Sequence, residues 1–465
     1  MKKNTSSRRN FLKNITGAAA ATAVGPGLLA HDVQILRHNL HISSNDKIRV
    51  GLIGAGIIGH YDMDAVLQVP GTELAAACDL YDGRLEYARE KWGNGILTTR
   101  DYREVLARPD IDAVLICTPD HWHSRISIDA LQAGKHVYCE KPMVQRVDEG
   151  HAVIEAQRKS GKVFQVGSQR ASSIITAEAR KQFESGIIGE LNFVECTNDR
   201  WNSNGAWNYS IPTDASPQTV DWDRFLGRAP RRPFDATRFF RWRNYSDYGT
   251  GVAGDLFVHL LTGVHTITGS LGPTRVFALG DINYWRDGRD AYDLVTALMD
   301  YPKTDRHPSF QMFLRVNQAS GTGGGGVCKL VGSDGVIDVG WNSLKVTHFK
   351  RPQANGYGGY DSYESFSAKQ KEEFKKWYES KFGNAPADMI PGEPIEFKPE
   401  EGYDDRYAHF VNFFESIRAG KPSVEDASFG LRAAAPSVLC NLSADRKKPV
   451  YWDPVQMKLL KKARV

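Results

Sequence analysis

This chain of 465 residues lacks several features that mark special classes of protein. It contains no uninterrupted run of about 18 apolar residues, so no internal membrane-spanning helix is expected. It also shows no internal repeat. Its composition, 41% hydrophobic and 25% charged, is that of an ordinary globular protein, and its length suffices for two domains with a sizeable core.

Acidic side chains are missing from the first 31 residues. The stretch SRRNFLK, Ser7 to Lys13, resembles the S-R-R-x-F-L-K pattern of a twin-arginine (Tat) export signal, and a weakly apolar, alanine-rich stretch follows it. The alternative is a basic N-terminus with no targeting role. We expect a Tat signal peptide over residues 1–31, a linker over 32–46, contact with the Tat translocase during export, and a periplasmic location.

The charge of the remaining chain is nearly balanced. Five of the 59 Lys and Arg residues lie in the first 31 positions, so 54 remain against 55 Asp and Glu. This balance gives no indication of nucleic acid or an acidic membrane surface as a partner.

Cysteine is scarce, and none of the six forms a C-x-x-C pair; they are Cys78, Cys117, Cys139, Cys196, Cys328 and Cys440. A Tat substrate normally folds in a reducing cytoplasm before export, so we expect free thiols, several of them buried near the ends of apolar runs. Metal-ligand patterns are lacking too, because there is no H-E-x-x-H and no acid or cysteine at ligand spacing. No metal is predicted.

From Lys47 onward, short apolar runs alternate with stretches of helical spacing. The runs predicted as strands are KIRVGLIG, TELAAACD, IDAVLICTP, KHVYCEKP and KVFQVGSQ. The predicted helices between them cover 57–69, 82–93, 124–134 and 147–160. This alternation predicts an α/β Rossmann domain with a doubly wound parallel sheet over residues 47–168.

The pattern changes after residue 168. Helices are predicted near 176–185 and 251–268, and alternating runs between 274 and 349 predict an antiparallel or mixed sheet with turns at glycine and Pro-Lys. A surface insertion with one charged helix is expected over 350–400, followed by closing helices near 404–418 and 425–444. We assign residues 169–465 to a second, substrate-binding α/β domain.

A glycine motif follows the first predicted strand. GAGIIG places Gly54, Gly56 and Gly59 in the G-x-G-x-x-G pattern, with Ile57 and Ile58 between the last two. The glycines suit a tight turn, close approach of the backbone to a pyrophosphate, and close helix–strand packing. The diphosphate of a dinucleotide would then lie at the N-terminus of the following helix, where free N–H groups favour an anion.

Asp79 ends the next predicted strand, 20 residues beyond Gly59. An acid at this place binds the adenosine ribose hydroxyls and repels a 2′-phosphate, so NAD is favoured over NADP. The alternative is an aspartate that only caps the next helix. A second glycine tract, GTGGGG at 321–326, lacks the Gly-Lys-Ser/Thr of a phosphate loop and is interpreted as a flexible connection within the sheet.

Together with CTPDHWH at 117–123 and CEKP at 139–142, the chain from about residue 46 onward resembles the Gfo/Idh/MocA family of oxidoreductases. The resemblance implies a Rossmann domain and a larger α/β domain with an open, mainly antiparallel sheet, and it implies a homo-oligomer. It places Lys141 beside the nicotinamide and the substrate hydroxyl. It also matches Asp255 and His259, four residues apart and so on one helix face, to the family's second motif.

The chemistry of alcohol oxidation suits these three side chains. A neutral imidazole can accept the hydroxyl proton, so His259 is the candidate base. Lys141 would stabilise developing alkoxide character, while Asp255 would bind a substrate hydroxyl or orient the catalytic groups. An Asp/His pair at this spacing is also common on helix surfaces. A functional role for the pair is favoured because Lys141 and the glycine motif occur in the same chain.

The resemblance adds further candidates for contact with the cofactor. They are Thr118, Pro119, His121 and His123 after a central strand, Glu140 beside the lysine, and Gln169 and Arg170 at the start of the second domain. The irregular part 198–248 is rich in Trp, Tyr, Arg and Asn, which stack on sugar faces and bind hydroxyls. Trp201, Trp242 and Arg243 are therefore candidate sugar contacts, although such aromatic side chains can also simply pack on their domain.

The leading hypothesis is an exported oxidoreductase that transfers a hydride between a sugar, glycoside or polyol and a tightly held NAD. An alternative is an NAD-dependent glycoside hydrolase that works by transient oxidation and elimination; the glycosidase branch of the resembled family departs from E-K-P at the lysine, which this chain retains. A third is a sugar- or partner-binding protein on a fold that has lost its dehydrogenase activity, which the intact Lys/Asp/His set disfavours.

Overall fold

The computed structural model describes residues 47–383 and 385–462. The predicted signal peptide (1–31) and linker (32–46) lie outside the described residues. Within those ranges, no helix combines the length and the apolar character needed to cross a membrane.

Six strands, all paired in parallel, form the first sheet in the order β3-β2-β1-β4-β5-β6. The strands are β1 (Ile48–Ile53), β2 (Thr72–Cys78), β3 (Leu97–Thr99), β4 (Ala113–Ile116), β5 (His136–Glu140) and β6 (Phe164–Gly167). The connecting helices are α2 (Ile57–Gln68), α3 (Asp82–Trp92), α4 (Tyr102–Ala107), α5 (Asp120–Gln132) and α6 (Gly150–Ser160), the last preceded by the 3₁₀ helix η1 (Val147–Glu149). This is the doubly wound fold predicted; only β3 and α4 were not anticipated.

The first sheet is buried on both faces. Along β4, Val114 and Ile116 join the apolar cluster that includes α5, while Ala113 and Leu115 join the cluster on the opposite face. Successive strand residues point to opposite faces, so a sheet covered on both sides needs an uninterrupted apolar run, as in AVLI.

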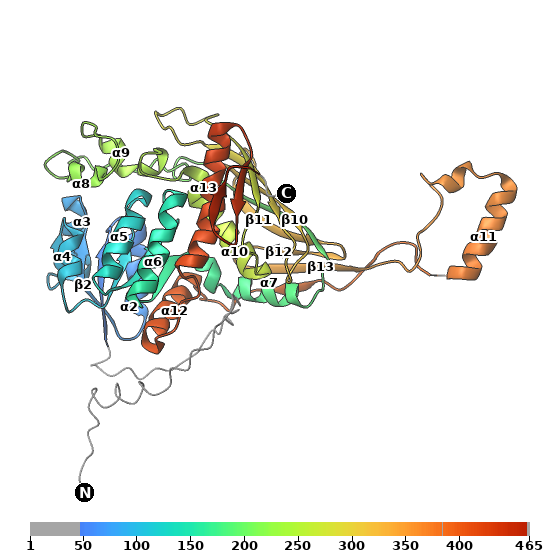
Figure 1. The fold of residues 1–465 in the computed structure, drawn as a ribbon, viewed down its shortest axis with the longest axis horizontal. Coiled ribbons are helices and arrows are strands. Elements are labelled where there is room, and N and C mark those ends of the chain that lie inside the picture. The colour runs from blue at the N-terminus through green and yellow to red at the C-terminus, as the bar shows by residue number, and fades with distance from the viewer. Residues whose placement is uncertain (1–46, 384, 463–465) are drawn as a thin grey trace, which may run out of the picture. The chain divides into compact units, whose positions relative to one another are not determined.

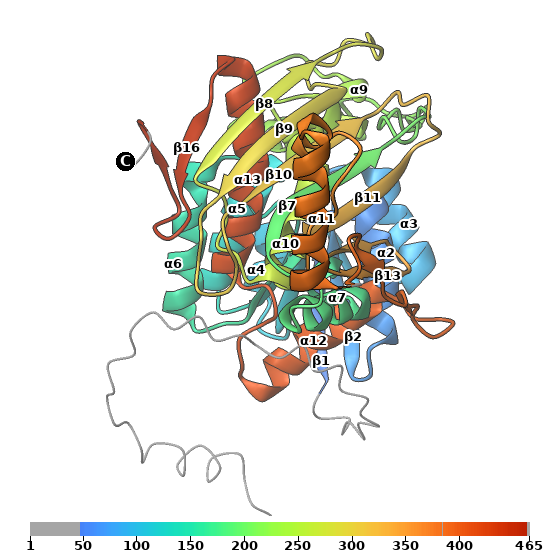
Figure 2. The same cartoon turned by 90° about the vertical axis from the view of Figure 1, so that its right-hand side faces the viewer.

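The second sheet has 11 strands, in the order β14-β13-β12-β11-β7-β10-β9-β8-β16-β17, with β15 paired to β13. Figure 2 shows its middle part, from β16 through β8, β9, β10 and β7 to β11. Among the described strand pairings of this second sheet, only β7–β10 is parallel, which confirms a mainly antiparallel sheet. The strands are β7 (Leu191–Asp199), β8 (Arg275–Asp281), β9 (Leu294–Tyr301), β10 (Phe310–Asn317), β11 (Gly325–Gly332), β12 (Gly335–Val339), β13 (Leu344–Lys350), β14 (Ile390–Pro391), β15 (Ile395–Phe397), β16 (Val450–Asp453) and β17 (Lys458–Leu460).

Helices cover one face of this sheet. They are α7 (Ile174–Glu184), α10 (Val258–Thr268) and α13 (Ala427–Arg446), and their apolar side chains share a single core with the inward residues of β7 to β12. Along β9, Val295, Ala297 and Met299 are buried, whereas Leu298 is 51% exposed on the other face. The alternation of buried and exposed residues explains the period-2 pattern seen in the sequence.

The helix α12 (Asp405–Ala419) belongs by sequence to the second domain but packs against the Rossmann sheet. Its Phe410, Phe413 and Phe414 are fully buried in one cluster with Leu52 of β1 and Tyr138 of β5. Figure 1 shows α12 and α13, drawn in red, beside the blue and teal helices of the first domain. A helix near the end of the chain therefore completes the apolar core on one face of the N-terminal sheet.

The insertion has the charged helix predicted from its sequence, α11 (Ala368–Phe382), preceded by the 3₁₀ helix η5 (Ser362–Ser365). Tyr363 and Tyr378 are buried within it, and the Phe374 ring packs against both at tilted angles. All six cysteines are free thiols, as expected, and five of them are buried.

Candidate active site

The glycine motif forms the turn between β1 and α2. Gly54 has a φ of +97°, and a Cβ atom there would lie 2.6 Å from the carbonyl carbon of Cys117, so only glycine fits. A Cβ on Gly59 would overlap the carbonyl oxygen of Gly54, so this glycine allows the helix to approach the strand. At Gly56 the nearest neighbour of a Cβ would be the Arg84 guanidinium, 3.6 Å away.

A cavity of about 530 Å³ opens beside this turn. Of the predicted cofactor contacts, Gly54, Gly56, Ile57, Ile58, Asp79, Thr118 and Pro119 line it. The Thr118 hydroxyl is buried and has no hydrogen-bond partner among the described residues. A free helix N-terminus, an unpartnered hydroxyl and a carboxylate at the end of β2 fit the diphosphate, a polar group and the ribose of NAD.

Asp79 is buried to 6% exposure at the end of β2. Its Oδ1 accepts a hydrogen bond from the amide of Tyr81 at 3.0 Å and lies 3.5 Å from Nη1 of Arg84. These contacts hold the carboxylate at the wall of the cavity, at the place predicted for recognition of the adenosine ribose.

The irregular segment 209–248 contributes a further wall to the cavity. It contains α8 (Trp222–Leu226), α9 (Ala236–Phe240) and η3 (Trp242–Asn244). On the side of β2, Val220 forms a β-bridge with Tyr81, whose hydroxyl donates to Asp214 at 2.6 Å. We call residues 209–248 the roof. The roof contacts the first domain on both sides of this cavity, which we call the nucleotide groove.

On the opposite side of the groove, the roof is bound to the start of α5. The amide of His121 donates to the carbonyl of Tyr248 at 3.1 Å, and the Trp122 indole donates to the carbonyl of Phe225 at 3.0 Å. Phe239 and Phe240 line the cavity, and the Arg84 guanidinium lies 5.6 and 5.3 Å from their ring centroids. The sequence interpretation missed this role, since nothing local in 209–248 indicates contact with the first domain.

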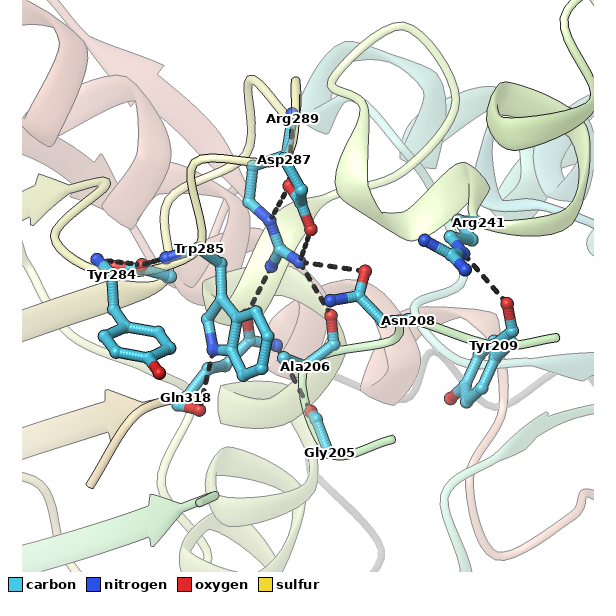
Figure 3. A network of polar contacts seen from close by, with 11 residues as sticks. Gly205, Ala206, Asn208, Tyr209, Arg241, Tyr284, Trp285, Asp287, Arg289 and Gln318 are labelled. Atoms are coloured by element: carbon cyan, nitrogen blue, oxygen red, sulfur yellow. Dashed lines mark hydrogen bonds and ion pairs between the residues drawn. The ribbon is translucent and has the colours of Figure 1, made fainter. Parts of the chain in front are cut away.

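A buried arginine anchors the start of the roof (Figure 3). The Arg289 side chain is 1% exposed and pairs with Asp287 at 2.7 Å. It also donates to the side chain of Gln318 at 2.9 Å and to the carbonyl of Ala206 at 3.0 Å. Three segments far apart in sequence are thereby joined just before Tyr209, which lines the cavity.

Lys141 directly follows β5. Its Nζ donates to Oδ1 and to the main-chain carbonyl oxygen of Asp255, each at 3.0 Å, and its side chain is 10% exposed. The peptide bond from Lys141 to Pro142 is cis. The His123 ring lies between the carbonyl oxygens of Pro142 and Thr118, at 2.7 and 2.8 Å, and so connects the lysine turn to the cofactor loop.

Asp255 lies in a π-helical turn, Ala253–Phe257, that leads into α10. Such turns interrupt the regular helical hydrogen-bond ladder and are frequent at functional sites. Nε of Arg243 donates to Oδ1 of Asp255 at 3.2 Å, so the carboxylate contacts two cations. Burial alone would raise the pKa of Asp255, but the charges of Lys141 and Arg243 hold it well below its usual range.

His259 is the second residue of α10. Burial, together with the positive charge of Lys141, lowers its pKa well below 6.5, against the opposing effect of Asp255. The imidazole is therefore neutral at neutral pH. Its ring lies 6.4 Å from that of Trp341, in a T-shaped arrangement, and the Arg170 guanidinium lies 4.0 Å from the centroid of the same indole.

The other residues predicted to contact the cofactor are Glu140, His121, Gln169 and Arg170. The Glu140 carboxyl points inward, where burial raises its pKa and where a Cβ on Gly167 would overlap it, so it anchors the turn. The His121 ring contacts the carbonyl oxygen of Phe225 at 2.8 Å. Gln169 and Arg170 lie in η2 (Gln169–Ser172).

The candidate sugar contacts fall into two groups. Trp242 and Arg243 line the cofactor cavity, and the guanidinium of Arg243 lies 4.2 Å from the Trp242 ring centroid. Trp201 lies after β7 and is 63% exposed.

Asp120 is a site residue that sequence reasoning missed. It is 1% exposed at the start of α5, and its Oδ2 accepts from the amide and hydroxyl of Thr250 at 2.9 and 2.7 Å. Burial and the negative charge of Asp255 raise its pKa to about 7. Its position directly after Pro119, in the loop that follows a central Rossmann strand, could have identified Asp120 as a candidate from the sequence.

The fold and the nucleotide cavity together place the chain in the class of dinucleotide-binding α/β proteins that carry a second α/β domain. More particularly, two parts of the chain match models of the Gfo/Idh/MocA oxidoreductase family. Residues 48–168 match its NAD-binding Rossmann domain, and residues 173–276 match its C-terminal alpha/beta domain.

Individual relatives match only part of the chain. Inositol 2-dehydrogenase of Salmonella typhimurium is 30% identical over 145 residues, 31% of this chain and 43% of that protein. A glycosyl hydrolase family 109 protein of Shewanella baltica is 33% identical over 208 residues, 40% of this chain and 44% of that protein. The chain thus spans less than half the length of these curated relatives.

Similarity of fold extends further than similarity of sequence. A solved levoglucosan dehydrogenase, in complex with NADH and L-sorbose, superimposes with a TM-score of 0.60 at 19% identity. That comparison covers 87% of this chain and 99% of the other, and it supports the two-domain fold.

Proposed function

We propose that this protein oxidises a secondary alcohol of a sugar, glycoside or polyol. The observation that carries the proposal is the group formed by Lys141, Asp255 and the neutral His259, joined to the nucleotide cavity through Arg243. Bound NAD supplies the hydride acceptor. Two of the relatives, an inositol dehydrogenase and a family 109 glycosyl hydrolase, agree with a polyhydroxylated substrate.

The protein's own residues divide the remaining work. A substrate hydroxyl near Lys141 gains a hydrogen bond and a positive charge as its oxygen becomes alkoxide-like. His259 takes the hydroxyl proton, because its imidazole is neutral over the physiological range. Asp255 holds Lys141 and Arg243 in place and keeps its own negative charge.

A tightly held cofactor is the second part of the proposal. The roof binds both sides of the nucleotide groove, at Tyr81 and at His121 and Trp122, so it opposes dissociation of a bound dinucleotide. Retention agrees with export of a folded protein through the Tat pathway, for which SRRNFLK is the motif. Electrons must then leave through a second carbonyl substrate or a redox partner.

Two measurements test this proposal. Mass spectrometry of denatured, purified protein should release one dinucleotide per chain. A panel of sugars and polyols should include members that raise the absorbance of the bound reduced nicotinamide. A cofactor-free protein with only weak affinity for NAD would contradict retention, and a panel without any response would contradict the oxidation.

A glycosidase is the second candidate function, and the similarity to the family 109 protein favours it. In that reaction the site would oxidise a sugar carbon, eliminate the aglycone, add water and reduce the carbon again. Release of nitrophenol from aryl glycosides, without net formation of NADH, would support this candidate. Net reduction without cleavage would support the dehydrogenase.

Pairing of two chains through the second sheet completes the proposal. The uncovered face of that sheet carries apolar side chains, with Leu279 60% and Leu298 51% exposed. Exposed apolar side chains on a sheet face are typical of association surfaces. The molar mass in solution, measured by light scattering, distinguishes a monomer from a homo-oligomer.

A further inference from the structure

The glycine tract 321–326 lies beneath two exposed tryptophans. A Cβ on Gly324 would lie 2.8 Å from the indole of Trp201, and a Cβ on Gly326 would lie 3.1 Å from Nε1 of Trp341. Gly324 also has a φ of +79°, which disfavours other residues. The tract is therefore more than a connection, since its missing side chains make room for two large aromatic rings.

Both tryptophans stay open to solvent despite this packing. Trp201 is 63% exposed and Trp341 is 43% exposed. Large aromatic side chains left uncovered and held by dedicated packing are typical of binding surfaces. Three exposed polar residues, Asn202, Ser203 and Asn204, follow Trp201 directly and offer hydrogen bonds beside the ring.

The surface formed by Trp201 and Trp341 adjoins the candidate catalytic base. The Trp341 ring is 6.4 Å from the ring of His259. Arg170 holds the indole from the buried side, through a guanidinium 4.0 Å from its centroid and a hydrogen bond from Nη1 to the carbonyl of Gly340 at 3.0 Å. Arg170 is itself only 6% exposed, so the indole rests on a fixed support.

We propose that Trp341 and Trp201 form a subsite for a second ring, linked to the sugar ring that is oxidised beside His259. The inference rests on the proposed function and deepens it: the substrate is a glycoside or a disaccharide rather than a free monosaccharide. The apolar C–H face of a pyranose matches an indole face, and the polar residues after Trp201 match its hydroxyls.

The test uses the full chain with its bound cofactor and three substrates that share the reacting ring: a monosaccharide, its methyl glycoside and a disaccharide. We expect kcat/KM for the disaccharide to exceed that for the methyl glycoside by about tenfold or more, because an apolar contact contributes on that order to discrimination. The Trp341→Ala and Trp201→Ala variants should remove most of this ratio, mainly through KM.

Two further variants serve as controls for the effect of the tryptophans on this ratio. Trp341→Phe keeps an aromatic ring and should keep most of the ratio. Trp377→Ala removes another tryptophan, 48% exposed on α11, and should leave the ratio unchanged. Equal kcat/KM for the three substrates, or a ratio that survives loss of both tryptophans, overturns the subsite.

Calorimetric binding of the disaccharide separates this proposal from the proposed function. If no sugar is oxidised, disaccharide binding that weakens by about tenfold in Trp341→Ala still supports the subsite. Oxidation of the monosaccharide and disaccharide with equal efficiency supports the oxidoreductase and contradicts the subsite. Unchanged disaccharide binding in Trp341→Ala contradicts the subsite in either case.

Discussion

The ammonium of Lys141 lies 3.0 Å from both the carboxylate and the main-chain carbonyl oxygen of Asp255. The first residue follows the fifth Rossmann strand, and the second lies in a π-helical turn of the other domain. This contact couples the two domains at the point where chemistry is proposed. It also means that the position of the lysine depends on a widened turn in a helix 114 residues away.

Replacement of Lys141 by alanine should lower kcat for alcohol oxidation by about 100-fold or more, the usual effect of removing one donor to a developing oxyanion. Bound NAD per chain should stay near the wild-type value. Stopped-flow measurement of bound-cofactor reduction checks the rate. Lys135 is a matched control, because it is a buried lysine at the other end of β5; Lys135→Met should lower stability without this loss of kcat per folded chain.

The pH profile of kcat/KM should report the lowered pKa of His259. A base must be deprotonated to act, so the rate rises with pH through the pKa of the imidazole, which lies well below 6.5. We therefore expect little loss of activity as the pH falls from about 7.5 to about 6.5. His259→Asn should lower kcat by about 100-fold or more and abolish the acidic limb. An acidic limb centred at or above 6.5 would contradict the role of burial.

Stability should depend on Asp120 between two pKa values. In the unfolded chain this carboxyl ionises near 3.8, whereas in the folded protein its pKa is about 7. Between these values only the folded state holds the proton, so stability falls as pH rises, by at most about 1.4 kcal/mol per pH unit. Asp120→Asn should therefore gain in melting temperature relative to the wild type from pH 4 to pH 7, with no further gain above.

The exposed Asp223, with its side chain 91% exposed, provides a control for that experiment. The difference between Asp223→Asn and the wild type should stay nearly constant over the same pH range. A constant difference for Asp120→Asn as well would show that Asp120 ionises at an ordinary pKa.

Coenzyme choice should depend on Asp79. Its carboxylate, fixed by the Tyr81 amide, would repel a 2′-phosphate, and Arg84 lies 3.5 Å away. Asp79→Ser should shift the ratio of NAD to NADP affinity toward NADP by about tenfold or more, because a like-charge contact costs several kcal/mol. Calorimetry on cofactor-stripped protein measures both affinities. An unchanged ratio would place the ribose away from this residue.

Retention of the dinucleotide should depend on the roof. The combined change Phe239→Ala and Phe240→Ala removes two rings that line the cavity and face Arg84. Loss of NAD during gel filtration should be about tenfold faster than in the wild type, as expected for truncation of large aromatic contacts. Phe382→Ala, at the end of α11, is the control and should retain its cofactor.

Some parts of the site could be predicted because their signals are local. The strand and glycine turn before α2, the acid at the end of β2 and the lysine after β5 each follow from a short stretch of sequence. The charged helix expected within 350–400 is α11, and its ends have local signals, because Ser367 caps its start and Gly383 follows its last residue.

Other parts depend on contacts between distant segments. Nothing near Val220 indicates that it pairs with Tyr81, and nothing near Trp341 indicates that it lies against His259. The helix α12 reads as an ordinary amphipathic helix of the second domain, yet its three phenylalanines fill the face of the first sheet. Such placements are decided by which apolar faces remain uncovered once the sheets have formed.

The parallel sheet and the nucleotide turn could be predicted from the sequence alone, because hydrophobic period and glycine spacing are properties of contiguous residues. Lys141, Asp255 and His259 became candidates because the short motifs around them resemble those of a known family. Only the tertiary structure decided that Asp255 binds Lys141 through a π turn, that the segment 209–248 covers the groove, and that a glycine tract supports Trp201 and Trp341. Those relationships join residues from 15 to more than 100 positions apart. The burial that shifts the pKa values of Asp120 and His259 exists only in the folded chain.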